Sequence, residues 1–374
     1  MTDDVWAAWR AARPATELLH LDSAAVGRSS IATLDAVTEH ALAESVEGGY
    51  VAQELAQPVL AELRRDVATL CGTDEEGVAF TESAMASLEA LLRAWPLPED
   101  ARVAVAASEW GPNIDVLDFL GIKVEQVPVD ADGVVDLDAL DRFLTDDPPD
   151  ALLLDHVAAH RGLVQPAAQV IEQGRRHGVP VLLDAAQSLG HLVVPPGADA
   201  VFATSRKWLT GPRGVGIIAV AEQHRSSLRV LRPGKHPDRL PVHLLEPDES
   251  HVAGRVGLRV AVGEYVALGP ASVEERLRDV GRLVRELAAT LDGWDVVHPS
   301  APAGALTSLR PTNGQDVAQS QHRLLHEHRI LTTVSQPWRA PAEMDPTEPW
   351  LRLSPHVDLT TDDLERLARA LSET

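Results

Sequence analysis

Seven short apolar segments, alternating with stretches long enough for helices, constrain the fold of this chain most strongly. They are VAFT (78–81), RVAVAA (102–107), KVEQVPV (123–129), ALLLDHV (151–157), PVLLDA (180–185), AVFATS (200–205) and VGIIAVA (215–221). Near-continuous apolar strands that alternate with helices are typical of a mostly parallel sheet covered on both faces. The pattern therefore predicts an α/β fold with a seven-stranded, mostly parallel sheet between helices. The last strand follows its predecessor through a short connection, so it can be antiparallel.

The other segments predict the helices and a second, smaller unit. Helices are expected at 3–12, 31–47, 52–71, 83–94, 112–121, 137–145 and 166–177, with a loop at 20–30. After residue 221 the periodicity weakens, and further helices are expected near 256–268, 271–291, 316–328 and 361–372. Short strands near 294–298, 304–309, 330–334 and 350–354 accompany the last of these. We therefore expect a large α/β domain at 15–265 and a small α+β domain at 266–374, joined by an N-terminal helix at 1–14.

The charge and the cysteine content exclude several classes of partner. The 374 residues contain 33 Lys plus Arg and 56 Asp plus Glu, which gives a formal net charge of −23. Such a charge repels phosphate backbones and anionic lipids, so we expect neither nucleic acid nor a membrane as partner. The only cysteine, Cys71, excludes an intrachain disulfide and a multi-cysteine metal site, and no metal is expected. The acidic segment MTDDVW lacks the features of a signal peptide, which predicts a cytoplasmic location.

Lysine is rare in this chain, and one lysine lies where α/β folds bind ligands. Only Lys123, Lys207 and Lys235 accompany the arginines, a bias that a GC-rich genome would produce. Arginine replaces lysine on a surface, but it cannot form a Schiff base, and its pKa does not fall far enough for it to act as a base. Lys207 follows the strand at 200–205 and precedes a glycine-rich turn, at the sheet edge where such folds place ligands. For this segment alone, a surface lysine beside a turn remains the alternative.

Three other strand ends carry side chains that suit a ligand. Asp184 ends an apolar strand, where an unpaired carboxylate is costly unless it caps the next helix. The segment FTESAM (80–85) opens a helix, whose free N–H groups either bind phosphate or form an ordinary cap. Trp110 ends another strand and either stacks on a ligand ring or packs in the core. Because the carboxyl ends of parallel strands meet at one edge, these groups would converge with Lys207. A lysine, an acid, an aromatic ring and a phosphate cradle together fit pyridoxal phosphate.

With these motifs the chain resembles the class V aminotransferase family of fold-type I pyridoxal phosphate enzymes, which includes the cysteine desulfurases. The resemblance extends from HLDSAA to LRLSPHVDLTTDDLERL. It implies that Lys207 carries the cofactor, that Asp184 faces the pyridine nitrogen and that Trp110 stacks on the ring. It also implies a ring-hydroxyl contact at Gln187, phosphate contacts at Ser83, Ala84, Met85, Thr204 and Arg206, and a substrate-carboxylate ligand at Arg352. Members are usually dimers with sites at the interface, which implies a homodimer in which Ser250 or His251 reaches the neighbouring phosphate.

Several positions depart from the family pattern. Met85 stands where threonine is common, and Arg206 stands where histidine usually precedes the lysine. Ala159 occupies the position at which desulfurases carry an asparagine near the ring hydroxyl. His160 lies near the expected substrate position, where it is a substrate contact, a proton shuttle or a structural histidine.

The cysteine content also bears on the reaction. A desulfurase needs a mobile nucleophilic cysteine, whereas Cys71 lies at the end of a predicted helix, as a buried structural thiol does. A β-elimination needs no cysteine. The chain length, the missing acceptor cysteine, Trp110 and the Arg-rich composition resemble the carbon–sulfur lyases that cleave hercynylcysteine sulfoxide toward ergothioneine, pyruvate and ammonia. We therefore expect a pyridoxal-phosphate-dependent lyase acting on a small amino-acid substrate. The alternative is another class V enzyme, namely a cysteine or selenocysteine lyase, an aminotransferase or an epimerase. Tyr50 either contacts the trimethylammonium group of hercynylcysteine sulfoxide through a cation–π interaction or packs between helices.

Overall fold

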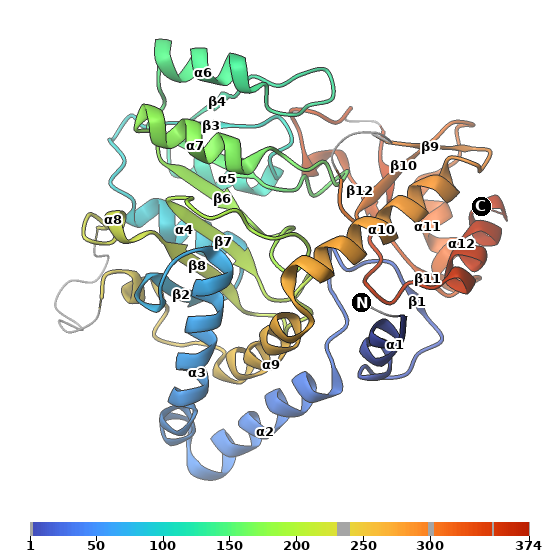
Figure 1. The fold of residues 1–374 in the computed structure, drawn as a ribbon, viewed down its shortest axis with the longest axis horizontal. Helices are drawn as coiled ribbons and strands as arrows, with labels where there is room; N and C mark the ends of the chain where they lie inside the picture. Colours follow the sequence, from blue (N-terminus) through green and yellow to red (C-terminus); the bar gives the residue numbers. More distant parts are fainter. Residues whose placement is uncertain (1–2, 230–239, 298–302, 346–347, 374) are drawn as a thin grey trace.

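A seven-stranded sheet forms the centre of the larger unit (Figure 1). The computed structural model describes residues 3–229, 240–297, 303–345 and 348–373, so Lys235 lies outside the described residues. The strand order is β2-β8-β7-β6-β5-β3-β4, and of these seven only β8 runs antiparallel to its neighbours. The bounds are β2 (Val78–Thr81), β3 (Arg102–Val105), β4 (Lys123–Gln126), β5 (Ala151–Asp155), β6 (Val181–Asp184), β7 (Ala200–Thr204) and β8 (Gly216–Val220). The predicted mostly parallel sheet is confirmed, and the last strand, whose direction the sequence left open, is antiparallel.

Alternate residues along the strands pack into two different buried clusters. Val103 and Leu153 belong to the cluster that contains the apolar faces of α4 (Ala84–Ala94) and α5 (Gly111–Phe119). Ala104 and Leu152 belong to the cluster that contains those of α6 (Leu137–Asp146) and α7 (Ala167–His177). Because both sheet faces are covered, both sets of side chains must be apolar, which explains the near-continuous apolar runs in the sequence. All four helices lie within one or two residues of their predicted bounds.

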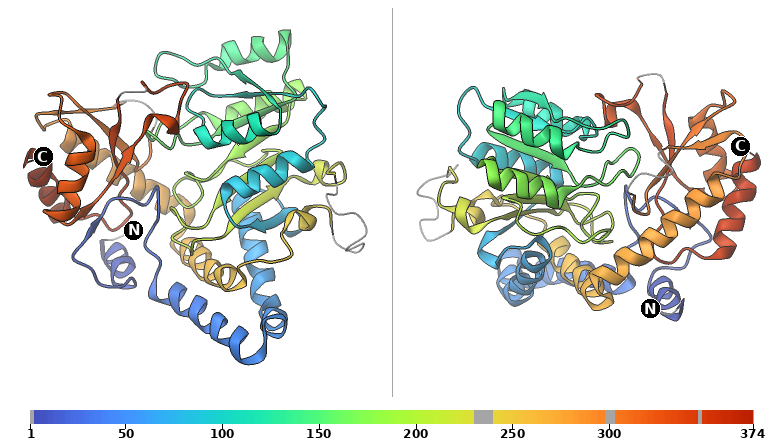
Figure 2. Two further views of the ribbon diagram at one scale, coloured as in Figure 1. Left: turned by 180° about the vertical axis from the view of Figure 1, so that it is seen from behind. Right: turned by 45° about the horizontal axis from the view of Figure 1, so that its top comes forward.

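Three helices precede the sheet in the chain, namely α1 (Asp3–Ala11), α2 (Ile31–Glu47) and α3 (Gly49–Cys71). The helix α3 contacts β2, and α9 (Val252–Leu268) lies against the hairpin of α2 and α3 (Figures 1 and 2). The helix α1 lies instead beside the C-terminal segment, where Arg10 pairs with Asp358 and Asp363. The sequence predicts α9 near 256–268, whereas the helix begins at Val252 and contains Gly254 and Gly257, although glycine disfavours a helix. A Cβ at Gly257 would clash with Val37 of α2, so the glycine permits close helix packing, and this packing offsets its low propensity. Among the helices of the described residues, none is both long and apolar enough to cross a membrane.

The C-terminal unit contains a separate antiparallel sheet, which α10 (Pro270–Ala288) connects to the larger unit (Figure 2). The strand order is β12-β13-β10-β9. The bounds are β9 (Trp294–Val296), β10 (Thr307–Pro311), β12 (Thr333–Ser335) and β13 (Trp350–Leu353), with α11 (Val317–His326) and α12 (Thr361–Glu373). A second, parallel pair joins β1 (Leu19–His20) to β11 (Ile330–Leu331), so the N-terminal segment is bound to this unit. The domain bounds 15–265 and 266–374 stay a prediction.

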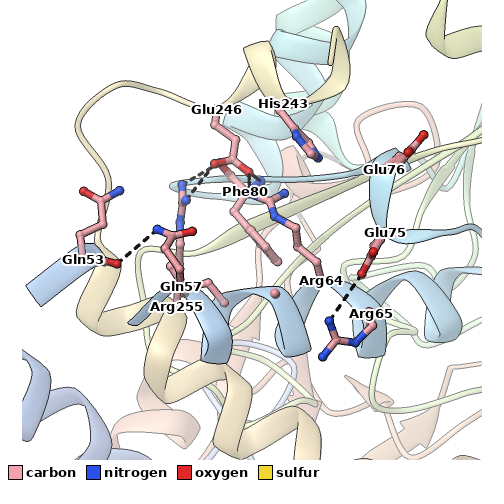
Figure 3. Close-up of a pocket in the computed structure, with 12 residues that line it drawn as sticks. Gln53, Gln57, Arg64, Arg65, Glu75, Glu76, Phe80, His243, Glu246 and Arg255 are labelled. Carbon is pink, nitrogen blue, oxygen red and sulfur yellow. Dashed lines mark hydrogen bonds and ion pairs between the residues drawn. The ribbon is translucent and has the colours of Figure 1, made fainter. Parts of the chain in front are cut away.

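A buried carboxylate fastens the loop after β8 to the edge of the large sheet (Figure 3). Glu246 follows η2 (Val242–Leu245) and accepts hydrogen bonds from the backbone N–H of Phe80 (3.1 Å) and from Arg255 (2.9 Å). Arg64 of α3 bonds the same carboxylate. Burial opposes ionisation of Glu246, but the two guanidinium charges outweigh it and lower the pKa of this carboxyl. The adjoining cavity of about 430 Å³ therefore borders arginines that are already neutralised, and Lys207 is not among the residues that line it.

Candidate active site

A smaller cavity, of about 150 Å³, lies at the carboxyl ends of β5, β6 and β7, against the first turns of α4 and α5. All the predicted cofactor contacts line it, namely Ser83, Ala84, Met85, Trp110, Asp184, Gln187, Thr204, Arg206 and Lys207. Asn113, Asp155, Val157, Ala159 and Ala186 complete the lining. Parallel strands bring their carboxyl ends to one edge, so residues up to 124 positions apart in the chain face the same space. The contacts of these side chains to a cofactor stay a prediction.

Lys207 and Asp184 form the charged centre of the cavity. Burial lowers the pKa of Lys207 to about 7, although the carboxylate of Asp184 opposes this effect. The positive charges of Arg206, Arg352 and Arg339 lower it further. A large fraction of Lys207 is therefore neutral near neutral pH, and a neutral amine acts as a nucleophile or as a base. Burial likewise raises the pKa of Asp184, which the charge of Lys207 counteracts.

Two donors hold the carboxylate of Asp184 in place. The backbone N–H of Ala186 donates to Oδ1 (2.7 Å), and Nδ2 of Asn113 donates to Oδ2 (2.9 Å). Nδ2 of Asn113 also donates to Oε1 of Glu109 (2.9 Å), which accepts a further bond from the N–H of Trp110. Burial raises the pKa of Glu109 well above its ordinary value, and the charges of neighbouring carboxylates add to this. The prediction that Trp110 ends a strand is wrong, because β3 ends at Val105 and Trp110 is the N-cap of α5. Sequence reasoning considered only Trp110 in this segment and missed Glu109 and Asn113, whose roles depend on contacts to Asp184.

Asp155 is a second strand-end carboxylate in the cavity. It lies beside Asp184 in the register of β5 and β6. Its Oδ1 accepts a hydrogen bond from Ser108 (3.0 Å), whereas its buried Oδ2 has no hydrogen-bond partner. Burial is the main reason why its pKa is well above the ordinary value. The rule that singled out Asp184 would also have found Asp155, since both residues end apolar strands.

The amide of Gln187 is held in one orientation. Its Oε1 accepts a hydrogen bond from Nε1 of Trp208 (2.9 Å), and its Nε2 donates to the carbonyl of Ala24 (3.0 Å). An indole N–H only donates, so Oε1 must face Trp208. The ring of Trp208 is itself stacked on His191, with centroids 4.0 Å apart. The second N–H of Gln187 therefore remains to donate to an acceptor in the cavity.

The first turn of α4 provides the predicted phosphate contacts. Ser83 caps the helix by accepting a hydrogen bond from the N–H of Ala86 (3.1 Å). The N–H groups of Ala84 and Met85 have no partner within the helix and carry the positive end of its dipole. A Cβ at Gly216 would clash with the carbonyl of Ser83, so this glycine lets β8 approach the turn. Thr204, the last residue of β7, and Arg206, which follows that strand, also line the cavity.

The three predicted substrate contacts, unlike the predicted cofactor contacts, lie outside the lining of the cavity. Arg352, in β13, is buried behind the cavity, where it donates to the carbonyl of Ala159 (2.9 Å) and pairs with Asp22 (3.4 Å). His160 is fully buried, and its Nε2 lies 3.0 Å from Oε2 of Glu343. Burial lowers the pKa of His160, as in a structural histidine. Tyr50 is 89% exposed on the hairpin of α2 and α3. None of these predicted substrate contacts lines the cavity of this chain, and their roles stay predictions.

Comparison with known proteins defines the family. The model of the class-V aminotransferases matches residues 19–319. The chain is 44% identical to a probable hercynylcysteine sulfoxide lyase of Mycobacterium tuberculosis, over 97% of this chain and 92% of that protein. This chain therefore belongs to the class-V aminotransferase family.

Solved structures agree with this assignment at the level of the fold. A cysteine desulfurase of Escherichia coli superposes with a TM-score of 0.84 at 20% identity, over 98% of each chain. A cystine C–S lyase, in a variant with glycine covalently linked to its PLP cofactor, superposes with a TM-score of 0.83. Its identity is 18%, over 96% of this chain and 97% of that one.

The residues of the cavity fit the cofactor expected for this family, pyridoxal phosphate. Lys207 has a lowered pKa, which an amine needs in order to bind an aldehyde at neutral pH. Asp184 would face the pyridine nitrogen, and the free N–H groups of α4 would receive the phosphate. The free oxygen of Asp155 and the remaining N–H of Gln187 offer further hydrogen bonds to the ring substituents.

Proposed function

We propose that this protein is a pyridoxal-phosphate-dependent carbon–sulfur lyase that cleaves hercynylcysteine sulfoxide by β-elimination, toward ergothioneine, pyruvate and ammonia. The observation that carries the proposal is 44% identity to a probable hercynylcysteine sulfoxide lyase along nearly the full length of both chains. The cavity supports it with a lysine of lowered pKa beside a buried carboxylate, which is the pair that this chemistry requires.

The side chains of the cavity can be given roles in this reaction. Pyridoxal phosphate, when bound, would supply an electron sink for the bonds to the substrate α-carbon. Nζ of Lys207, neutral in about half of the molecules at pH 7, would accept the α-proton. Asp184 would hold a proton at the pyridine nitrogen, while Asn113 keeps the carboxylate oriented. The indole of Trp208 would keep the amide of Gln187 turned with its N–H toward the ring hydroxyl.

The state of Cys71 argues against a persulfide mechanism. It is the only cysteine of the chain, it is buried at the end of α3, and burial raises its pKa to about 12. A sulfur acceptor must be an exposed thiolate. We therefore favour elimination over transfer of sulfur to the protein.

We also propose that the chain forms a homodimer through the hairpin of α2 and α3. Leu42, Val46 and Leu55 are 60%, 78% and 69% exposed there, and several large apolar side chains exposed on one hairpin are typical of a contact surface. Tyr50 is exposed on the same hairpin, so any contact with substrate would be made to that of a neighbouring subunit. Val46→Glu should give monomers in light scattering; an unchanged mass would contradict this surface. The cytoplasm is the proposed location, which fractionation of cells would test.

The function is tested by measuring pyruvate released from hercynylcysteine sulfoxide, with cysteine as the alternative substrate. Lys207→Ala should lower this activity by about 10²- to 10⁴-fold. Lys123→Ala, which alters an exposed lysine of β4, is the control and should retain activity. Alanine from cysteine without pyruvate from the sulfoxide would indicate a desulfurase-like enzyme. A racemised or transaminated product would indicate an epimerase or an aminotransferase.

A further inference from the structure

Arg339 lies beside the cavity and contacts two aromatic rings. It ends η3 (Pro337–Arg339), which follows β12 in the C-terminal unit. Its Cζ is 5.2 Å from the ring centroid of Trp110 and 5.0 Å from that of Trp338. These two rings meet edge to face, with centroids 5.1 Å apart. Trp110 lines the cavity, so the guanidinium lies next to the space that a substrate would enter.

The packing of the loop keeps Arg339 there. A Cβ at Gly111 would clash with the carbonyl oxygen of Trp338, so the glycine lets η3 rest on the start of α5. The stem of Arg339 is partly buried, and burial lowers its pKa to about 10, which still leaves it charged at neutral pH.

This guanidinium has no anionic partner within the described residues. Its Nε is buried and makes no hydrogen bond. Asp22 acts on it electrostatically but forms its ion pair with Arg352. In contrast, Arg352 also donates to the carbonyl of Ala159, and Arg206 donates to the carbonyl of Ala25. A partly buried cation without an acceptor is costly, so a ligand that supplies one would be bound favourably.

The charge of Arg339 acts on the site itself. It lowers the pKa of Lys207, as do Arg206 and Arg352, so the charges of three arginines act on this lysine. The whole chain carries a net charge of −23, which makes a local cluster of arginines a specific attraction for anions. Arg206 and Arg352 correspond to the predicted phosphate and α-carboxylate contacts. Arg339 is left without a group to bind.

We propose that Arg339 binds a carboxylate on the sulfur substituent of the substrate, beyond the cysteine portion, and thereby selects S-substituted cysteines that carry a negative charge there. This proposal rests on the proposed function. Hercynylcysteine sulfoxide has such a group, because its trimethylated histidine portion carries a second carboxylate. The trimethylammonium group of the same portion must point away from Arg339, since like charges repel.

The test compares two sulfoxides that differ only in this charge. S-carboxymethylcysteine sulfoxide carries the carboxylate, and S-carboxamidomethylcysteine sulfoxide replaces it with a neutral amide of the same shape. The holoenzyme should release pyruvate from the acid with a kcat/KM about 10- to 100-fold higher than from the amide, the range for one charge-assisted hydrogen bond. Arg339→Met should abolish this preference by lowering kcat/KM for the acid alone. Arg339→Lys should restore part of it. Arg310→Met, at an exposed ion pair on β10, is the control and should change neither value.

Binding provides a readout that does not depend on turnover. Calorimetry in the Lys207→Ala background measures the dissociation constants of both compounds. Adding Arg339→Met should raise the dissociation constant of the acid 10- to 100-fold and leave that of the amide unchanged. An equal loss of affinity for both compounds would overturn the proposal, because it would mean that Arg339 contacts the cysteine sulfoxide portion that the two compounds share. No loss for either would overturn it as well. If the enzyme releases no pyruvate from any sulfoxide, the proposed function fails, whereas the two dissociation constants still decide the role of Arg339.

Discussion

The lowered pKa of Lys207 makes a quantitative prediction about cofactor capture. An ordinary lysine, with a pKa of 10.5, would be neutral in about one molecule in 3,000 at pH 7. With a pKa of about 7, Lys207 is neutral in about half of the molecules. Only the neutral amine attacks an aldehyde. The rate at which the apoenzyme captures pyridoxal phosphate should therefore rise about tenfold per pH unit below 7 and level off above it.

The sign of the effect can be checked with one substitution. The charge of Asp184 opposes the lowering of the Lys207 pKa, so Asp184→Asn removes a stabilising anion. The pH at which the rate of cofactor capture levels off should then fall below 7, and the rate should stay constant at higher pH. Stopped-flow absorbance at the band of the bound cofactor, between pH 5.5 and 9, measures both profiles. The same reaction with Nα-acetyl-lysine corrects for the ionisations of the aldehyde. A wild-type rate that still rises at pH 9, or an inflection that moves upward in Asp184→Asn, would refute the reasoning.

Three other predictions address the packing behind the site. Asn113→Leu removes the hydrogen-bond donor to the buried carboxylates of Glu109 and Asp184. The free energy of unfolding in urea should therefore fall by about 1–3 kcal/mol, and the affinity for pyridoxal phosphate should weaken. If neither quantity changes, the amide does not have this role. Cys71 should resist thiol reagents in the native protein and react once per chain after unfolding, and Cys71→Ala should keep its lyase activity; rapid native labelling would argue against a buried thiol. Gly162→Ala should lower the free energy of unfolding by about 1–3 kcal/mol or more, because φ is 79° and the new Cβ would clash with a backbone carbonyl. Gly121→Ala is the control, since φ is 74° there and its Cβ would meet open space, so it reports the backbone strain alone. Equal losses of stability in thermal unfolding of the two variants would show that the clash at Gly162 has no effect.

The strands and their polar ends could be predicted from sequence because both depend on local pattern. Each apolar run of 78–221 became a strand, since a sheet that is covered on both faces demands apolar side chains along its inner strands. The edge strand β4 is the exception, because its side chains are exposed or half-buried. The chain direction of parallel strands then puts Lys207 and Asp184 at one edge, whatever the details of packing. The same reasoning would have included Asp155.

Other parts of the site could not be predicted, because they depend on side-chain direction and on contacts between distant segments. His160 was placed near the substrate by its position in the chain, yet its ring is buried against Glu343. Asn113 lies in a helix, and nothing in its local sequence shows that it reaches Asp184. Arg339 looks like any surface arginine of a chain rich in arginine until η3 is seen resting on α5.

The sequence by itself determined the fold class, the family and the edge of the sheet where the charged residues meet, because periodicity and strand direction are properties of the chain. Only the tertiary structure decided which charges are neutralised. Arg352 meets Asp22 across 330 positions of sequence, whereas Arg339 meets aromatic rings and no anion among the described residues. A buried charge is costly unless it is paired, and pairing depends on distances of a few ångströms between segments that the sequence does not place.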